Sequence, residues 1–263
     1  MSDDPAADAP SPADDRKAAA RLTRRVSQLE ATLEHVELIR DTNARMLERI
    51  RGELETEQAR SQRLLLNVLP QPIIDRLNDG EELIADRYDD VAVVFSDLVG
   101  FTELSARLDV ATLVSSLNGL FSAFDAACAA LGVEKIKTIG DAYMAAAGLP
   151  GTSPEPVRAA ADLALAIQAA VREAGDPWQV RIGIHTGPVV AGVIGTTKFV
   201  YDLWGDAVNT ASRLETTAPV GGIQVSAAVA LALGDAYELE PRGAIELKGK
   251  GSTETFLLLG RRA

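Results

Sequence analysis

Apolar residues recur at alternating spacings of four and three residues from about Leu22 to Val68. This heptad spacing is typical of a helix that pairs with a second copy, because a long helix with one apolar stripe is not stable alone. Polar residues interrupt the stripe at four positions: Arg40, Asn43, Glu57 and Ser61. We therefore expect a coiled-coil dimerisation helix over residues 21–68, with polar positions that lower its stability. A long helix packed back on its own domain is the alternative.

The segments on either side of this stripe have other patterns. Residues 1–20 are rich in Ala, Asp, Pro and Ser and hold too few apolar side chains to form a core, so we expect a disordered acidic tail. Pro70 and Pro72 end the helical pattern, because two prolines so close cannot continue a regular helix. A short amphipathic stretch follows, and we interpret residues 69–85 as a connector to the domain beyond.

Strand and helix patterns alternate through the rest of the chain, residues 86–263. The patterns predict, in order, a strand at 91–95, a helix at 111–131, strands at 133–139 and 143–147, a helix at 156–174 and a strand at 180–184. The order β-α-β-β-α-β is that of a ferredoxin-like split βαβ sheet, an α/β (α+β) fold, with helices on one face. We also predict a turn at 185–188, a strand at 189–194 and a helix near 208–215.

Two aspartates lie where predicted strands end. Asp97 follows the first strand, and Asp141 lies in the hairpin turn between the second and third. A split βαβ sheet places the first strand beside that hairpin, so both carboxylates are expected at one sheet end. Mg²⁺ is commonly held by one or two carboxylates together with substrate phosphates. We predict a shared divalent-metal site, with the helix start at Gly100, Phe101 and Thr102 offering backbone N–H groups to a phosphate.

Composition narrows the classes of partner. A formal net charge of −12 argues against a nucleic-acid-binding surface, which needs clustered Lys and Arg. The separations of Cys128, His35 and His185 exclude a Cys/His zinc site, and Cys128 is expected to be a buried, reduced thiol. We expect His185 to be a hydrogen-bonded turn residue rather than a general base.

No apolar run reaches the roughly 18 residues of a membrane span. We expect a soluble, cytoplasmic chain, or the cytoplasmic part of a membrane-anchored protein.

Three longer blocks resemble the signature blocks of the class III nucleotide cyclases. They are residues 95–102 (FSDLVGFT), 134–144 (EKIKTIGDAYM) and 201–213 (YDLWGDAVNTASR), in the family's order. The similarity spans about residues 86–260. The resemblance implies that Asp97 and Asp141 are the two metal-binding carboxylates, holding two Mg²⁺ or Mn²⁺ ions per site.

The resemblance also implies roles for the remaining site residues. Asn209 and Arg213 match the family's transition-state pair, in which the asparagine orients the ribose and the arginine stabilises charge on the α-phosphate. They lie four residues apart and hence on one helix face. Lys248 corresponds to a lysine that contacts the triphosphate, with its near neighbour Lys250 as the alternative.

Two positions in these blocks select the base in the family. Lys137 and Asp202 match the adenine-selecting residues of adenylyl cyclases, since a lysine can donate to adenine N1 and an aspartate can accept from the N6 amine. Guanylyl cyclases of the family carry Glu and Cys there. ATP is therefore the expected substrate. The two side chains can also pair with each other in the empty site.

The family's active site is shared, with metal carboxylates from one domain and the base-selecting, Asn and Arg residues from its partner. Both sets are present in this chain, so the resemblance implies a homodimeric adenylyl cyclase with two complete sites. The alternatives are a guanylyl or poorly selective cyclase, and a catalytically silent nucleotide-binding adaptor in which the coiled coil is the functional part. A sensor or membrane partner is expected to act through the N-terminal helix.

Overall fold

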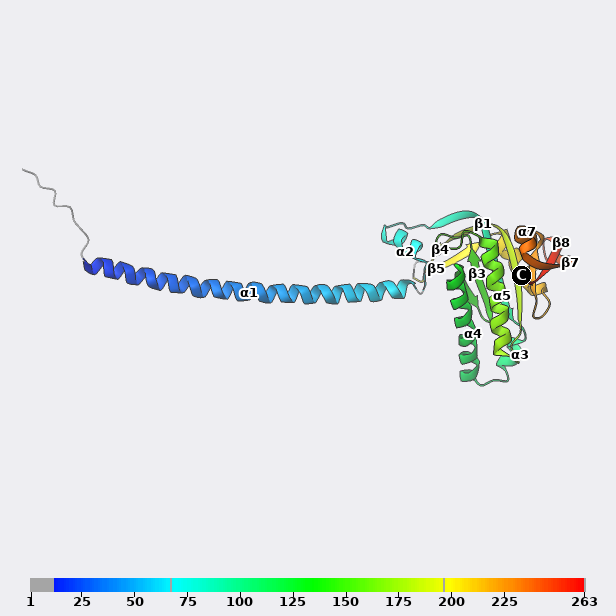
Figure 1. The fold of residues 1–263 in the computed structure, drawn as a ribbon, viewed down its shortest axis with the longest axis horizontal. Coiled ribbons are helices and arrows are strands. Elements are labelled where there is room, and N and C mark those ends of the chain that lie inside the picture. The colour runs from blue at the N-terminus through cyan, green and yellow to red at the C-terminus, as the bar shows by residue number, and fades with distance from the viewer. Residues whose placement is uncertain (1–11, 67, 196, 263) are drawn as a thin grey trace, which may run out of the picture. The chain divides into compact units, whose positions relative to one another are not determined.

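The computed structural model describes residues 12–66, 68–195 and 197–262. The chain divides into two compact units, one up to Leu65 and one from Leu66 onward. Figure 1 shows the long helix of the first unit and the sheet and helices of the second.

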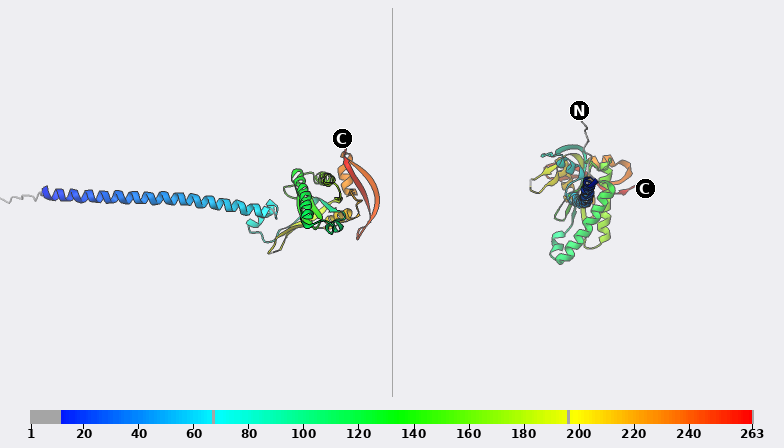
Figure 2. Two further views of the ribbon diagram at one scale, coloured as in Figure 1. Left: turned by 90° about the horizontal axis from the view of Figure 1, so that it is seen from below. Right: turned by 90° about the vertical axis from the view of Figure 1, so that its left-hand side faces the viewer.

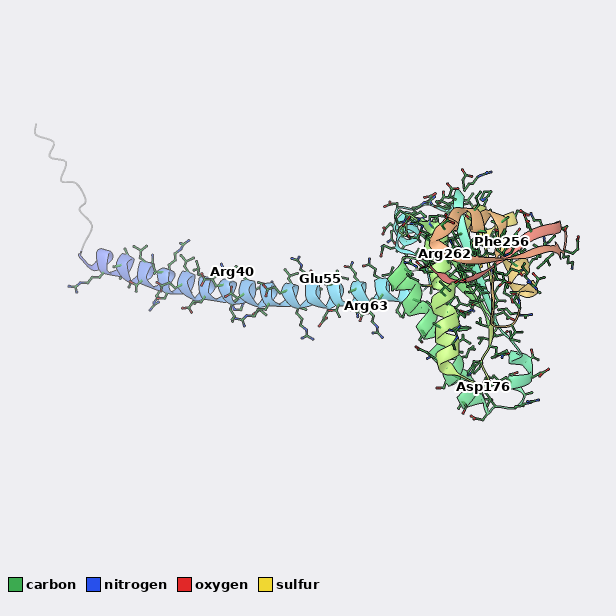
Figure 3. All side chains as sticks on the ribbon, turned by 45° about the vertical axis from the view of Figure 1, so that its right-hand side comes forward. Arg40, Glu55, Arg63, Asp176, Phe256 and Arg262 are labelled. Atoms are coloured by element: carbon green, nitrogen blue, oxygen red, sulfur yellow. The ribbon has the colours of Figure 1, made fainter. Side chains whose placement is uncertain are left out.

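The first unit is a single helix, α1 (Pro12–Leu66). Its side chains from residue 16 onward are exposed, and they project from the helix along its length (Figure 3). Ion pairs one turn apart, such as Arg49–Glu53 at 2.8 Å, add modest helix stability. The apolar stripe predicted from the heptad spacing is exposed as well, with Leu29 62% accessible. An exposed apolar stripe on a helix of this length needs a partner to bury it.

The start of α1 differs from the expected disordered tail at 1–20. The helix begins at Pro12, so residues 12–20 are helical, and residues 1–11 lie outside the described residues. Proline is tolerated in the first turn of a helix, and the alanines at 18–20 have the highest helix propensity. These local preferences outweigh the acidic composition.

The second unit is built around one eight-stranded sheet. Its strand order is β2-β3-β1-β4-β6-β8-β7, with β5 paired to β4. The strands are β1 (Ala85–Leu98), β2 (Glu134–Ile139), β3 (Ala142–Ala147), β4 (Val180–Ile194), β5 (Val200–Trp204), β6 (Ile223–Ser226), β7 (Tyr237–Leu247) and β8 (Gly251–Arg261). The order β2-β3-β1-β4 is that of a split βαβ sheet, so the predicted fold class is confirmed. The long β7–β8 hairpin forms the outer edge (Figure 2).

Helices cover both faces of this sheet. The helices are α2 (Gln71–Asn78), α3 (Phe101–Ser105), α4 (Val110–Leu131), α5 (Pro156–Ala174), α6 (Asp206–Thr217) and α7 (Ala227–Leu233), followed by a 3-10 turn at Gly234–Ala236. β1 alternates between two cores: Val94 packs with α4 and α5, whereas Val93 packs with α2 and α6. The expectation of helices on one face therefore holds for α4, α5 and α7. It misses α2 and α6, whose apolar residues cover the second face.

The predicted turn at 185–188 is wrong. β4 runs without a break from Val180 to Ile194, and β1 pairs with it on both sides of Pro188. A proline cannot donate to the ladder, but the pairing of β1 with β4 shifts register between Tyr88 and Val91, opposite this stretch. A bulge is one of the places where a strand tolerates proline. The Gly-Pro pair therefore marks an irregular ladder, not a turn.

One helix has the length and composition of a membrane span, contrary to the expectation that none would. Within the described residues, only α4 is long and apolar enough. One face of α4 is buried in the sheet-facing core, where Phe124 meets Tyr143 edge to face at 5.5 Å. The length and composition of α4 are therefore weak evidence for a membrane-spanning helix.

Candidate active site

Asp97 and Asp141 lie at the same end of the sheet, as predicted. β1 and β3 are antiparallel neighbours, and Asp97 is paired with Ala142, the residue after Asp141. Gly140 takes a left-handed conformation with φ of 63°, which lets the hairpin turn place Asp141 directly before β3. Burial and the nearby negative charge of Asp97 raise the pKa of Asp141. Two carboxylates that disfavour each other's charge form a place suited to a cation.

A positively charged side chain of the protein, Arg181, lies next to Asp97. Arg181, on β4, is the cross-strand partner of Asp97 on the other side of β1, and its Nη2 lies 3.1 Å from Asp97 Oδ2. The same guanidinium has its Nε 3.5 Å from Oε1 of Glu215, a buried residue on α6. Burial, followed by the negative charge of Asp97, raises the pKa of Glu215 to about 7.

Sequence reasoning missed both Arg181 and Glu215. The sequence does indicate that Arg181 is unusual, because it is the one charged residue in the apolar strand Val180–Ile184. Glu215 is unusual because it is an acid on the buried face of a helix. That face can be identified only when the packing of α6 is known.

The predicted phosphate-binding residues follow Asp97. Gly100 is left-handed with φ of 73°, and α3 begins at Phe101 and contains Thr102. The first N–H groups of a helix have no partner within it. Phe101 packs its ring against the core, while Thr102 is exposed. The backbone of this turn is therefore held in place next to Asp97.

Lys137 and Asp202 come together from two strands. Lys137 Nζ lies 2.5 Å from Asp202 Oδ2, and Asp202 Oδ1 accepts a hydrogen bond from the Leu203 N–H at 2.8 Å. A pocket of about 500 Å³ lies beside Lys137, with Thr138 and Tyr201 among its lining residues. Lys137 and Asp202, the predicted base-selecting residues, thus form an ion pair. The pocket beside them is lined by both apolar and polar residues.

Asn209 and Arg213 lie on one face of α6. Asn209 is exposed and Arg213 is partly exposed, whereas Ala211 and Leu214 on the other face are buried. The guanidinium of Arg213 lies against the β7–β8 turn, since a Cβ built at Gly249 would be 3.7 Å from its Nη2. The arginine and the turn that carries Lys248 are therefore neighbours.

The two lysines of that turn differ. Lys250 forms an ion pair with Asp206 at the start of α6, while Lys248 is exposed and takes part in no ion pair among the described residues. This difference favours Lys248 over Lys250 as the residue able to meet a ligand.

The predicted site residues form separate groups within one chain. One group is Asp97 with Asp141; the others are the Lys137–Asp202 pair and the α6 face with its neighbouring turn. No hydrogen bond or ion pair joins the aspartates to the other groups in the part of the chain that the structure describes. None of these groups by itself surrounds a substrate.

Two other sequence candidates have structural roles. His185 lies in β4 and not in a turn, its Nδ1 is 2.8 Å from Ser226 Oγ, and burial lowers its pKa. Cys128 is buried as expected, and burial raises its pKa to about 11. Among the described residues, neither forms a hydrogen bond or ion pair with Asp97 or Asp141.

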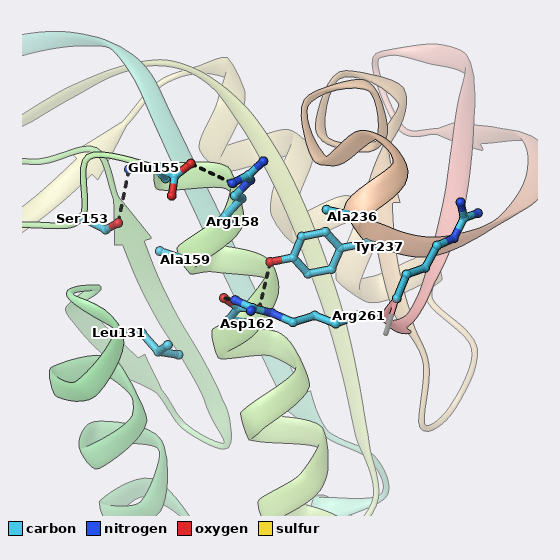
Figure 4. Close-up of a pocket in the computed structure, with 10 residues that line it drawn as sticks. Leu131, Ser153, Glu155, Arg158, Ala159, Asp162, Ala236, Tyr237 and Arg261 are labelled. Carbon is cyan, nitrogen blue, oxygen red and sulfur yellow. Dashed lines mark hydrogen bonds and ion pairs between the residues drawn. The ribbon is translucent and has the colours of Figure 1, made fainter.

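A pocket of about 410 Å³ lies elsewhere, between α5 and the end of β8 (Figure 4). Asp162 accepts hydrogen bonds there from Tyr237 and Arg261, while Arg158 pairs with Glu155 at 2.9 Å. Asp162 is thus paired with Arg261, and Glu155 with Arg158. None of the predicted site residues lines it.

Known proteins match most of the chain, including the second unit. The family described as Adenylate and Guanylate cyclase catalytic domain matches residues 83–260. An adenylate cyclase of Mycobacterium tuberculosis (strain ATCC 25618 / H37Rv) is 46% identical over 219 residues, which are 81% of this chain and 49% of that protein. The chain spans about half the length, or less, of the curated relatives it matches.

Two solved structures have the same fold. The guanylate cyclase domain of RhGC from Catenaria anguillulae, in complex with GTP, has a TM-score of 0.65 and 35% identity, covering 67% of this chain and all of that one, 100%. The adenylyl cyclase CyaB from P. aeruginosa has a TM-score of 0.64 and 28% identity, covering 68% of this chain and 97% of that one.

Proposed function

The chain belongs to the adenylate and guanylate cyclase catalytic domain family, and we propose that it is a homodimeric adenylate cyclase. It converts ATP to 3′,5′-cyclic AMP and pyrophosphate. The 3′-oxygen of the ribose attacks the α-phosphorus, the bond from that phosphorus to the pyrophosphate oxygen breaks, and the hydroxyl proton passes to solvent.

The observation that supports this proposal best is the presence of two complementary residue groups on one chain. The carboxylates Asp97 and Asp141 lie at one sheet end, and Asn209 and Arg213 lie on the outer face of α6. No hydrogen bond or ion pair joins the two groups among the described residues, so we expect a second copy to bring one group of each kind together. A homodimer would hold two such sites, and a monomer none.

The carboxylate pair suits a hard divalent cation. Both side chains are partly buried, and no third His, Cys, Asp or Glu joins them into a ligand cluster among the described residues. Such a donor set fits Mg²⁺ or Mn²⁺, which take their other ligands from phosphates and water. Two ions held by Asp97 and Asp141 would lower the pKa of the 3′-hydroxyl and neutralise the triphosphate.

The other residues bind and orient the substrate. Asn209 holds the ribose so that its 3′-oxygen faces the α-phosphorus, which removes much of the entropic cost of the reaction. Arg213 donates hydrogen bonds to the α-phosphate oxygens, where negative charge grows in the transition state. Lys248 contacts the triphosphate from the neighbouring turn, and the backbone N–H groups of Gly100, Phe101 and Thr102 meet it from the metal side.

Lys137 and Asp202 favour ATP over GTP. Lys137 donates to adenine N1, and Asp202 accepts from the N6 amine. Guanine presents an N1–H donor and an O6 acceptor, which would leave both side chains facing a group of the wrong kind. Both residues remain partly accessible, with side-chain exposures of 33% and 14%, so a base can reach them.

The N-terminal helix supplies a reason for two copies to meet. Its exposed apolar stripe is buried if a second α1 pairs with it as a coiled coil, and the polar positions Arg40 and Asn43 lower the stability of that coil. A sensor or membrane partner would act through this helix. The connector at 69–85 transmits the signal, because Ile73 and Ile74 of α2 are buried in the core shared with α6.

Product analysis with ATP and with GTP tests the proposed function. The full chain with Mn²⁺ should form cyclic AMP and little cyclic GMP, and light scattering on the same sample should show a dimer. Absence of both cyclic nucleotides would overturn the enzyme assignment, and a preference for GTP would overturn the substrate assignment.

A further inference from the structure

Arg181 has acidic partners on two different elements. Besides its contacts with Asp97 on β1 and Glu215 on α6, its Nη1 donates to the Thr216 carbonyl oxygen at 3.4 Å. The guanidinium therefore lies between the metal-binding strand and the last turn of α6. It is only 29% exposed, so its choice of partners is limited to these groups.

The contact with Glu215 is incomplete. Arg181 Nε and Glu215 Oε1 are both buried and neither makes a hydrogen bond within the described part of the chain, although they lie 3.5 Å apart. A buried donor or acceptor without a hydrogen bond is costly, so a small turn of the guanidinium toward Glu215 would be favourable. At present Nη2 is held by Asp97 instead.

Glu215 is held at this distance by the backbone. α6 lies directly on β4 at Gly183, where an added Cβ would be 2.1 Å from Glu215 N and 2.4 Å from Ala211 O. Gln224 Nε2 donates to the Leu214 carbonyl oxygen at 3.1 Å and fixes the same turn from β6. The backbone of Glu215 therefore cannot shift with Arg181, and a turn of the guanidinium toward Glu215 closes the gap most simply.

On the basis of the proposed function, we propose that Glu215 is a positioning residue that retains Arg181 when a divalent cation binds Asp97. A guanidinium and a divalent cation on the same carboxylate repel each other, so Arg181 must release Asp97 for the ion to bind. Glu215 is the second carboxylate within reach. Without its negative charge, Arg181 stays on Asp97 and competes with the ion.

Direct Mn²⁺ binding tests this role without relying on turnover. Free Mn²⁺ is measured by electron paramagnetic resonance at pH 7 in titrations of the full chain, its Glu215→Gln variant, its Arg181→Gln variant and the double variant. We expect Glu215→Gln to weaken Mn²⁺ binding about 5- to 20-fold, because the competing guanidinium is no longer drawn away. In the Arg181→Gln background, Glu215→Gln should change binding less than about twofold.

The reason for that small second effect is the charge state of Glu215. Its pKa of about 7 is already held down by Arg181. Loss of the arginine raises the pKa further, so the carboxyl carries less charge, and no guanidinium remains for it to draw away from Asp97. Glu238→Gln, at an exposed position on β7, is the control for loss of one acidic charge and should leave Mn²⁺ binding unchanged.

Two outcomes overturn the role of Glu215: unchanged Mn²⁺ binding in Glu215→Gln with the fold intact by thermal melting, or equal weakening in both backgrounds. Failure of the proposed function would look different. A wild-type chain that binds Mn²⁺ but makes no cyclic nucleotide contradicts the cyclase assignment, and the comparison among the four proteins still decides the role of Glu215.

Discussion

Lys137 Nζ and Asp202 Oδ2 lie 2.5 Å apart, which joins β2 to β5, two strands that are not paired with each other in the sheet. The two residues are 65 positions apart in the chain. Each carries the hydrogen-bonding character that adenine requires, and together they neutralise each other in the ligand-free protein. This pair is the basis of the first prediction.

Exchange of the pair for Lys137→Glu with Asp202→Cys should shift the preference from ATP toward GTP. Both hydrogen-bonding positions are altered, and each is worth about 1–3 kcal/mol when a buried polar group is left unpaired. The ratio of kcat/KM for GTP to that for ATP should therefore rise at least about 30-fold. Steady-state kinetics with both nucleotides measures it.

Lys135→Glu is the matched control for that experiment. Lys135 lies two residues earlier on β2 and pairs with Asp125 at 2.7 Å, away from Asp202. Its substitution should leave the ATP to GTP ratio unchanged. An equal shift in this control would mean that charge on β2, and not base recognition, sets the preference.

The two lysines of the β7–β8 turn should differ in their effect on substrate binding. Lys248→Ala should raise the KM for ATP about tenfold or more, because a charge-assisted contact to phosphate is lost. Lys250→Ala removes the ion pair with Asp206 and should change KM less than about threefold, since partly exposed pairs contribute little. A larger effect of Lys250→Ala on KM would reverse the assignment.

Glu215 should make the stability of the domain depend on pH. Its ordinary pKa of 4.5 is raised to about 7 by burial and by the charge of Asp97. Between these values the unfolded chain has lost the proton and the folded chain keeps it, so the free energy of unfolding falls as pH rises from about 4.5 to about 7.

The Glu215→Gln variant has no proton to lose at this position. Its melting temperature relative to wild type should therefore rise from pH 5 to about pH 7 and level off above that pH. Thermal unfolding in a pH series measures this difference. A difference that stays constant with pH would mean that Glu215 keeps its ordinary pKa in the folded protein.

Removal of the N-terminal helix should make activity depend on protein concentration. A chain starting at Leu66 keeps the second compact unit but loses the apolar stripe of α1. Specific activity should then fall on dilution from about 10 µM to about 10 nM, as dimers dissociate. Arg49→Gln in the full chain removes only an exposed ion pair and should behave as wild type. Concentration-independent activity of the shortened chain would contradict a dimerising role for α1.

Local patterns predicted much of the fold. Helical periodicity placed α5 at its observed bounds, Pro156–Ala174, and apolar runs located the strands of the split βαβ sheet. The turn at 185–188 was wrong because glycine and proline also occur where a strand pairs irregularly. The start of α1 was misplaced because alanine propensity outweighed acidic composition.

Site residues could be predicted from the sequence only where the residue stands out from its local pattern. Asp97 and Asp141 interrupt apolar strands, so their chemistry is visible in the sequence. Arg181 and Glu215 meet through cross-strand register and through the close contact of α6 with Gly183, which no local pattern reports. The pairing of Lys137 with Asp202 likewise followed from family resemblance and not from periodicity.

The central claim is that each active site takes its metal carboxylates from one chain and its Asn–Arg pair from the other. Asp97→Ala and Arg213→Ala should each lower cyclase activity by at least about two orders of magnitude. In an equal mixture, half of the dimers are mixed and each holds one intact site of two, so activity should return to about a quarter of wild type. A mixture of Asp97→Ala with Asp141→Ala is the control and should stay inactive, because both lesions fall in the same group.

The most direct measurement is cyclic AMP formation by these two mixtures, with mixed dimers verified by pull-down through a tag on one variant. We predict recovery with Asp97→Ala plus Arg213→Ala and none with Asp97→Ala plus Asp141→Ala. Absence of recovery in the first mixture despite mixed dimers, or recovery in the second, would contradict the shared site.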